Sequence, residues 1–139
     1  AGAAEVYLTL LETIATDTPD QRAGLIEPLT NILGQLQALA KTIPIALPRS
    51  LLCAGWLAHL EGGRATADTR LRESTRQASR LNMPFEQGLA HYHQGRWLPP
   101  DDPLRVQYLG QACAIFTRLG AAHHLAKAKA ALDQSDVSS

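Results

Sequence analysis

The sequence has no excess of charge of either sign. Thirteen Lys and Arg residues balance thirteen Asp and Glu residues, so the formal net charge at pH 7 is zero. Proteins that bind nucleic acid through its phosphates usually carry a strongly basic surface. The charge balance therefore argues against DNA or RNA as a partner.

Long hydrophobic runs are absent, and cysteines are few. No stretch of 18 apolar residues occurs, and the N-terminus lacks the basic and apolar regions of a secretory signal. The two cysteines, Cys53 and Cys113, each lie in an apolar helical stretch, which favours reduced structural thiols over a disulfide framework. We expect a cytoplasmic protein with no membrane segment.

The five histidines do not form a metal-binding pattern. His91 and His93 are two residues apart, about 200° around a helix, so their side chains cannot face one metal ion. The adjacent residues His123 and His124 also point in different directions. His59 aligns with His91 in a repeat described below, but neither has a Cys or carboxylate at ligand spacing beside it. The prediction is that the chain holds no metal and no cofactor.

Catalytic motifs are also missing. The sequence has no Gly-x4-Gly-Lys-Ser/Thr phosphate loop and no cyclase metal-binding aspartate motif. Cys53 and His59 are separated by about 9 Å of helical rise, which is beyond hydrogen-bond reach. Asp101 and Asp102 lie between prolines, where Asp is expected as a turn residue and helix N-cap. We predict that this chain is not an enzyme.

What the sequence does contain is helical periodicity. Apolar and small residues recur at spacings of three and four, as on one face of an α-helix, whereas strand-like alternation is hardly visible. The four stripes are Leu25, Leu29, Ile32, Leu36, Leu39 and Ile43; Ala67, Leu71, Ser74, Ala78 and Leu81; Leu104, Tyr108, Ala112, Ile115 and Leu119; and Ala121, Leu125, Ala128 and Leu132. The pattern predicts an all-α protein.

Prolines and glycines divide these stripes into about seven helices. The expected ranges are 3–16, 20–42, 48–62, 66–81, 84–96, 103–119 and 121–133, followed by a polar tail at 134–139. Pro84 and Pro103 should occupy first-turn positions, where a missing N–H costs nothing. Pro28 falls inside the second helix and should either kink it or split off its first turn.

One segment occurs twice. Leu57-Ala58-His59-Leu60-Glu61-Gly62-Gly63-Arg64 and Leu89-Ala90-His91-Tyr92-His93-Gln94-Gly95-Arg96 lie 32 residues apart, while an offset of 33 aligns Gly55 and Gly62 with Gly88 and Gly95. A period of this size on helical sequence is typical of stacked antiparallel helix pairs. We therefore predict a single domain over 1–139, built as an αα superhelix and forming a fragment of a larger protein.

The repeat resembles the tetratricopeptide (TPR) superfamily. Gly55, Gly62, Ala67 and Leu71 stand at the relative positions of that motif, and the second unit offers Ala112 with Phe116. The resemblance implies a TPR-like fold.

A narrower resemblance covers about residues 44–132. It is carried by these segments: Pro48-Arg49-Ser50-Leu51-Leu52, Ala78 through Tyr92, Gly95-Arg96, Asp101-Asp102-Pro103, Ala112 through Phe116 and Leu119-Gly120-Ala121. They are similar to the C-terminal TPR-like region of large bacterial signalling proteins. Those proteins join an AAA-type or STAND-type ATPase to a class III adenylate or guanylate cyclase, or to a kinase. The resemblance implies a regulatory or partner-binding role, with catalysis outside this chain.

The candidate partner-binding residues are three arginines and two tryptophans. Arg72, Arg76 and Arg80 recur every four residues along one helix and could bind carboxylates or phosphates of a partner, or form a solvated face. Trp56 is expected in the core, with the inner surface of the array as the alternative. Trp97 follows Gly95-Arg96 and is expected to be the more exposed ring.

Together these patterns predict a non-catalytic, TPR-like module for protein–protein interaction or regulation. Its partner would be a protein or peptide, or another domain of the same polypeptide. One alternative is a homodimer in which the Ala-rich helix from Ala121 to Leu132 packs on a second copy. Another is a small-molecule sensor with its site in a cleft between helices.

Overall fold

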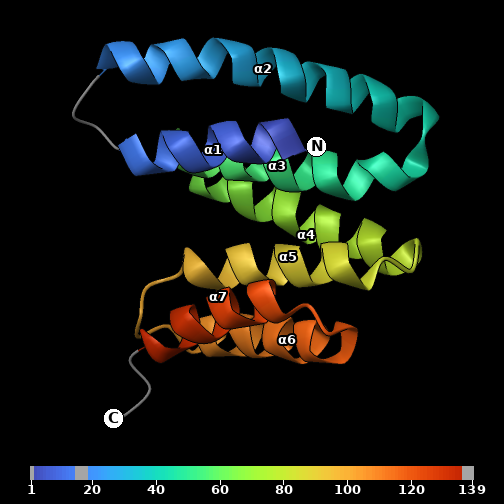
Figure 1. Cartoon of the computed structure of the whole chain (residues 1–139), viewed down its shortest axis with the longest axis vertical. Helices are drawn as coiled ribbons and strands as arrows, with labels where there is room; N and C mark the ends of the chain where they lie inside the picture. Colours follow the sequence, from blue (N-terminus) through green and yellow to red (C-terminus); the bar gives the residue numbers. More distant parts are fainter. Residues whose placement is uncertain (1, 15–18, 136–139) are drawn as a thin grey trace. The chain divides into compact units, whose positions relative to one another are not determined.

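The computed structural model describes residues 2–14 and 19–135, and these residues form helices joined by short turns (Figure 1). The helices are α1 (Gly2–Ile14), α2 (Pro19–Thr42), α3 (Leu47–Leu60), α4 (Arg64–Arg80), α5 (Pro84–Arg96), α6 (Pro103–Leu119) and α7 (Ala122–Asp133), with a short 3-10 helix, η1 (Pro44–Ala46). No strand occurs among the described residues. The predicted all-α class and the number of helices are confirmed, while the superhelical stacking stays a prediction.

The chain divides into two compact units, Ala1–Glu73 and Ser74–Ser139, and each is described by itself. The division falls inside α4. Positions 15 and 16 of the first predicted helix lie outside the described residues, as does most of the predicted tail.

The helix boundaries follow the capping chemistry of the sequence. Pro84 and Pro103 begin α5 and α6 as predicted, and the Asp102 side chain accepts a hydrogen bond of 2.9 Å from the Leu104 N–H. Gly120 ends α6 in the left-handed conformation (φ 69°), where the Ala121 N–H donates to the Phe116 carbonyl. Short-range signals therefore decide where these helices begin and end.

Pro28 does not split α2. The helix is continuous from Pro19 to Thr42, so of the two predicted effects the splitting of the first turn is wrong, and the kink stays a prediction. Leu29, Leu33 and Leu36 follow the proline and are buried, with 0%, 5% and 8% of their surface exposed. Proline has no N–H, so one backbone hydrogen bond of the helix is missing. The burial of these three leucines offsets that loss.

In the first unit α1 packs against α2 and α3, and α3 also packs against α4. Glu5 of α1 forms an ion pair with Arg49 of α3, and the Trp56 indole N–H donates to the Glu12 carboxylate. Gly55 lets α4 approach closely, because a Cβ there would lie 3.1 Å from the Cβ of Arg70. The core consists of Leu8, Leu11, Leu29, Leu33, Leu52, Cys53, Trp56 and Leu71.

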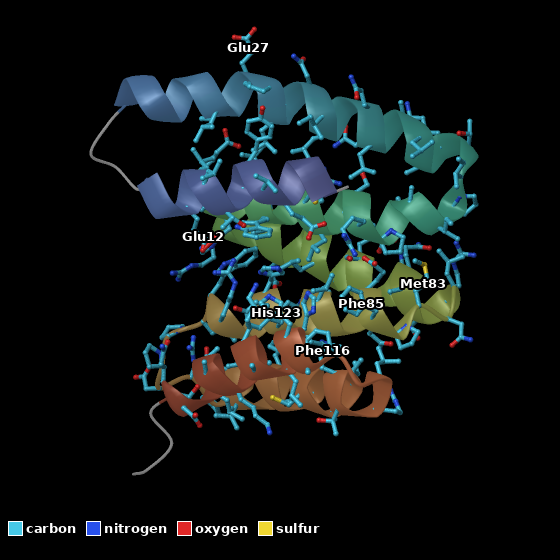
Figure 2. The ribbon with its side chains drawn as sticks, in the orientation of Figure 1. Glu12, Glu27, Met83, Phe85, Phe116 and His123 are labelled. Carbon is cyan, nitrogen blue, oxygen red and sulfur yellow. The ribbon has the colours of Figure 1, made fainter. Side chains whose placement is uncertain are left out.

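In the second unit α5 packs along α6, and α7 packs mainly on α6. Gly88 and Gly95 of α5 face α6 so closely that a Cβ would lie 2.8 Å from the Phe116 ring and 2.7 Å from Leu109 Cγ. The Phe85 and Phe116 rings meet at 5.9 Å between α5 and α6 (Figure 2). This core consists of Leu89, Ala90, Leu109, Ala112, Ile115, Phe116 and Ala128.

The ends of two predicted apolar stripes are exposed. Leu39 and Ile43 of the α2 stripe are 44% and 43% exposed, and Leu104 and Leu119 of the α6 stripe are 45% and 42% exposed. For α2 the reason is length, because its 24 residues span about 36 Å whereas α1 and α3 each span about 20 Å. Shorter neighbours cannot cover the whole of the longer helix.

Candidate functional site

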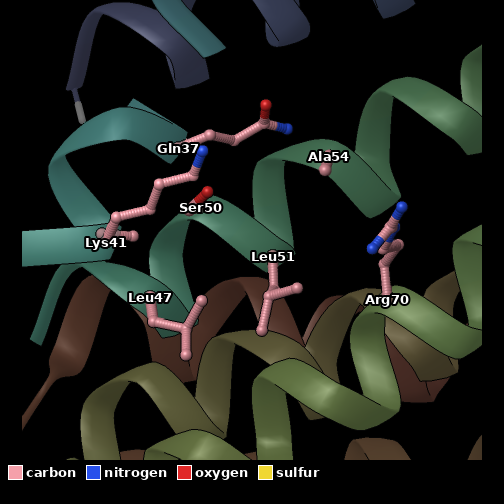
Figure 3. A pocket seen from close by; sticks show the side chains of 8 residues that line it. Gln37, Lys41, Leu47, Ser50, Leu51, Ala54 and Arg70 are labelled. Carbon is pink, nitrogen blue, oxygen red and sulfur yellow. The ribbon is translucent and has the colours of Figure 1, made fainter. Parts of the chain in front are cut away.

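A groove runs between α2 and α3 in the first unit (Figure 3). It consists of two open hollows of about 380 Å³ and 280 Å³ that share Gln37 and Ala54 as lining residues. The larger hollow is lined by Gln37, Ala40, Lys41, Leu47, Ser50, Leu51, Ala54 and Arg70. The smaller is lined by Thr30, Leu33, Gly34, Gln37, Ala54, Leu57, Ala58 and Glu61. We call the two hollows together the α2–α3 groove.

Helical spacing and small residues build this groove. The lining residues recur at steps of three and four along α2 and along α3, so each helix presents one continuous face. Small residues keep the groove open, among them Gly34, Ala40, Ala54 and Ala58. At Gly34 an added Cβ would meet no atom within 4 Å.

The polar residues of the larger hollow have no partners among the residues that the structure describes. Lys41 and Arg70 are exposed cations without an ion pair there, and Gln37 makes no side-chain hydrogen bond. Ser50 is only 4% exposed as a residue. Its hydroxyl makes no hydrogen bond within the described chain, but it is not one of the buried polar atoms without a partner, so it is open to solvent in the hollow. Figure 3 shows Lys41, Ser50 and Gln37 gathered on one side of the hollow and Arg70 on the other. The hollow therefore presents donors and positive charge around an apolar centre.

Arg72, the member of the predicted arginine row in the first unit, lies on a different face of α4 from Arg70. Arg72, Arg76 and Arg80 are exposed, whereas Arg70, which lines the groove, is about 200° around the helix from Arg72. Arg72 pairs with Asp68 at 2.9 Å, with 66% of its side chain exposed. The Arg80 Nε donates to Gln77 at 2.9 Å. The role predicted for this row stays a prediction.

The two tryptophans are both packed. Trp56 is 7% exposed, which agrees with the expected core position. Trp97 caps the end of α5 and is half-buried, so it is the more exposed of the two tryptophans, as expected, although its ring is packed. The Arg96 guanidinium lies over the Trp97 ring at 5.2 Å, and the His93 ring lies 5.4 Å away. These contacts hold Trp97 against α5 because a guanidinium is attracted to an aromatic face.

The histidines serve packing in the second unit. His93 is 5% exposed and accepts a hydrogen bond of 2.9 Å from the Arg96 Nε. His91 is half-buried and stacks on the Tyr108 ring at 6.0 Å. Burial lowers the pKa of His91 from its ordinary 6.5, and a hydrogen bond with the Gln94 side chain acts in the opposite direction. Within the described ranges, no three His, Cys, Asp or Glu residues are grouped so that they could hold a metal ion.

The two cysteines show no disulfide bond. Cys53 is fully buried in the first unit. In the second unit burial raises the pKa of the half-buried Cys113 thiol, and nearby Lys129 lowers it by a smaller amount. Both observations fit the predicted structural thiols.

Arg105 is a buried residue that the sequence patterns missed. Its Nη1 donates to the carbonyls of Arg96 at 2.9 Å and Leu98 at 2.8 Å, and its Nη2 donates to the Ala131 carbonyl at 3.1 Å. Its Nε also donates to the Ser135 hydroxyl. The residue is 5% exposed and joins the C-terminal ends of α5 and α7 to the start of α6.

A signal for Arg105 exists in the sequence. Arg105, Leu109, Ala112 and Phe116 form an inward stripe at helical spacing; it shares Ala112 with the predicted α6 stripe, and its other members each follow a residue of that stripe. A cation in the first turn of a helix is unfavourable for the helix dipole. Its presence there therefore indicates acceptors elsewhere, which the carbonyls of α5 and α7 supply.

Comparisons of the chain with protein-family models, with curated proteins and with solved structures each find no match. Among the described helices, none is both long enough and apolar enough to span a bilayer.

Proposed function

We propose that the chain is a non-catalytic helical module that binds a segment of another protein, or of another domain of the same polypeptide, in the α2–α3 groove. The observation that carries the proposal is the groove itself. Two helices each contribute a continuous face to it, and polar groups without partners among the described residues line an apolar floor. Peptide-binding proteins commonly hold a segment in such a groove between helices.

The shape of the groove favours a chain segment over a small molecule. Small-molecule sites usually enclose most of the ligand surface, whereas both hollows here are open to solvent and adjoin along the helices. A segment that lies lengthwise can contact both hollows at once. The apolar floor would then bury its side chains, and the polar rim would fix its position.

The resemblance stated for residues 44–132 supports a wider role. We propose that the module is the TPR-like interaction or regulatory part of a larger bacterial signalling protein that contains an ATPase or a nucleotide cyclase. The flanking sequence of the full-length gene tests this part of the proposal. An ATPase or cyclase domain beside the segment supports it, and a gene that encodes neither domain contradicts it.

Two glycine substitutions test the groove. Gly34→Leu fills it, and no atom lies within 4 Å of the new Cβ. Gly24→Leu is the matched control, because Gly24 is also in α2 with open space around it but does not line the groove. Both changes replace a helical glycine by a better helix former, so neither should destabilise the fold.

The binding probe is a library of random dodecapeptides selected on the wild-type chain, with affinities measured by fluorescence anisotropy. Enriched peptides should bind the wild type and Gly24→Leu equally, and should bind Gly34→Leu at least about tenfold more weakly. If no peptide is enriched, or if Gly34→Leu binds like the wild type, the proposed function is wrong.

A further inference from the structure

We infer that the segment held in the α2–α3 groove is acidic, with an apolar side chain placed between carboxylates that Lys41 and Arg70 bind. This inference rests on the proposed function and names the chemistry of its partner. It concerns the larger hollow, where α2, α3 and α4 each contribute side chains.

The first argument is the positive charge of the hollow. Lys41 comes from α2 and Arg70 from α4, and neither pairs with an acidic group in the part of the chain that the structure describes. Two other arginines of this unit are paired, since Arg49 binds Glu5 and Arg72 binds Asp68, whereas the exposed Arg64, outside the groove, has no ion pair with a described residue. Lys41 and Arg70 are therefore both available to an external anion, and a carboxylate suits both an ammonium and a guanidinium.

The second argument is the hydrogen-bonding character of the hollow. Ser50 and Gln37 line the hollow, and neither side chain makes a hydrogen bond to another described residue. Ser50 and Gln37 can both donate, and an ionised carboxylate is an acceptor only.

The third argument is the apolar centre of the hollow. Leu51 and Ala54 lie between Lys41 and Arg70 in the view of Figure 3, and Leu47 also lines the hollow. A protein segment can place an aliphatic or aromatic side chain there and an acidic residue on either side.

Glu61 sets the direction of the segment. It lines the smaller hollow, beyond Gln37 and Ala54, and it has no ion pair with another described residue. A carboxylate of the partner would be repelled there, while a neutral or basic residue would be accepted. The acidic part of the segment therefore lies over Lys41 and Arg70, and its other part lies beside Glu61.

The test uses the peptides enriched from the dodecapeptide library, with the double variant Lys41→Gln/Arg70→Gln. We expect the enriched sequences to be rich in Asp and Glu around an apolar residue, and to bind the double variant about tenfold more weakly than the wild type. The control is Arg118→Gln/Lys129→Gln, which removes two exposed cations of the second unit and should leave affinity unchanged. Circular dichroism should show the same helical content in all variants.

The outcomes separate this inference from the proposed function. Peptides that Gly34→Leu blocks, but that are not acidic or bind the Lys41/Arg70 variant normally, overturn the inference and leave the proposed function standing. Failure to obtain any peptide that Gly34→Leu blocks overturns both. Self-association of the free chain that the Lys41/Arg70 variant abolishes assigns the groove to a second copy, and this too overturns the inference.

Discussion

Arg105 shows how a single buried cation can be stabilised without a carboxylate among its hydrogen-bond acceptors. The carbonyls at the C-terminal end of a helix lack intrahelical partners and carry partial negative charge. Arg105 meets such carbonyls from the ends of α5 and α7, so it satisfies acceptors that would otherwise need water. The guanidinium suits this task because its donors are fixed in one plane.

We predict that Arg105→Ala lowers the free energy of unfolding by about 2–4 kcal/mol, because it removes charge-assisted hydrogen bonds and side-chain packing from a buried position. Urea denaturation followed by circular dichroism measures this change. Arg118→Ala, on the exposed surface of the same helix, should cost less than about 0.5 kcal/mol. Equal losses in the two variants would contradict the role given to Arg105.

His91 should make stability depend on pH. Its pKa is lowered in the folded state, so the unfolded chain binds the proton more readily than the folded chain does. The contribution of the neutral imidazole is therefore fully present above pH 6.5, and it is lost as the pH falls from 6.5 through the folded pKa. Replacing His91 by Gln should reduce the loss of stability between pH 7.5 and pH 5.

Thermal unfolding of the wild type and of His91→Gln at both pH values measures this effect. His123→Gln serves as the control because His123 is exposed. If both variants follow the pH dependence of the wild type, burial of His91 does not contribute to it.

At the scale of the helices, two glycines of the second unit differ in their surroundings. A Cβ at Gly95 would lie 2.7 Å from Leu109 Cγ, whereas a Cβ at Gly110 would meet no atom within 4 Å. Gly95→Ala should therefore destabilise the protein by about 1–3 kcal/mol through overpacking. Gly110→Ala should stabilise it by about 0.5–1 kcal/mol, because alanine restricts the unfolded chain and favours helix.

The pair is measured by urea denaturation under identical conditions. Stabilisation by both substitutions would show that α5 and α6 can separate without cost at Gly95, contrary to the packing described for the second unit.

The helices themselves were predictable because their limits depend on local chemistry. Several helix boundaries depend only on nearby residues, namely those at Pro84, Asp102, Pro103 and Gly120. Gly62 and Gly95 align in the sequence repeat, but they have different structural roles. Gly62 adopts φ 85° in a turn, while Gly95 lies within α5 against Leu109.

The groove could not be predicted in the same way. Gln37, Lys41 and Ser50 form it only because α2 and α3 pack side by side, and no spacing within one helix shows this pairing. Arg70 could not be assigned to the groove from the sequence either, since the other residues that line the larger hollow come from α2 and α3. Sites made between elements need the packing of those elements to be known.

For the molecule as a whole, the choice between partner binding and self-association can be tested by sedimentation. A module that holds a separate segment should sediment as a monomer at all concentrations reached. The alternative, a dimer through α7, would be weakened by Ala126→Glu or Ala130→Glu, because both positions are exposed on that helix. A dimer that these substitutions abolish would contradict the monomer prediction and favour the alternative.

The hydrogen bonds of Arg105 to the ends of α5 and α7 also offer a way to look for relatives of this chain. Gly88 and Gly95 are fixed by contact with α6, and Arg105 is fixed by carbonyls of α5 and α7, so these three residues should change together or not at all. Two glycines about two turns apart, followed by an arginine in the first turn of the next helix, make a short evolutionary signature. Such a signature could persist in sequences that have drifted too far for the whole chain to be matched.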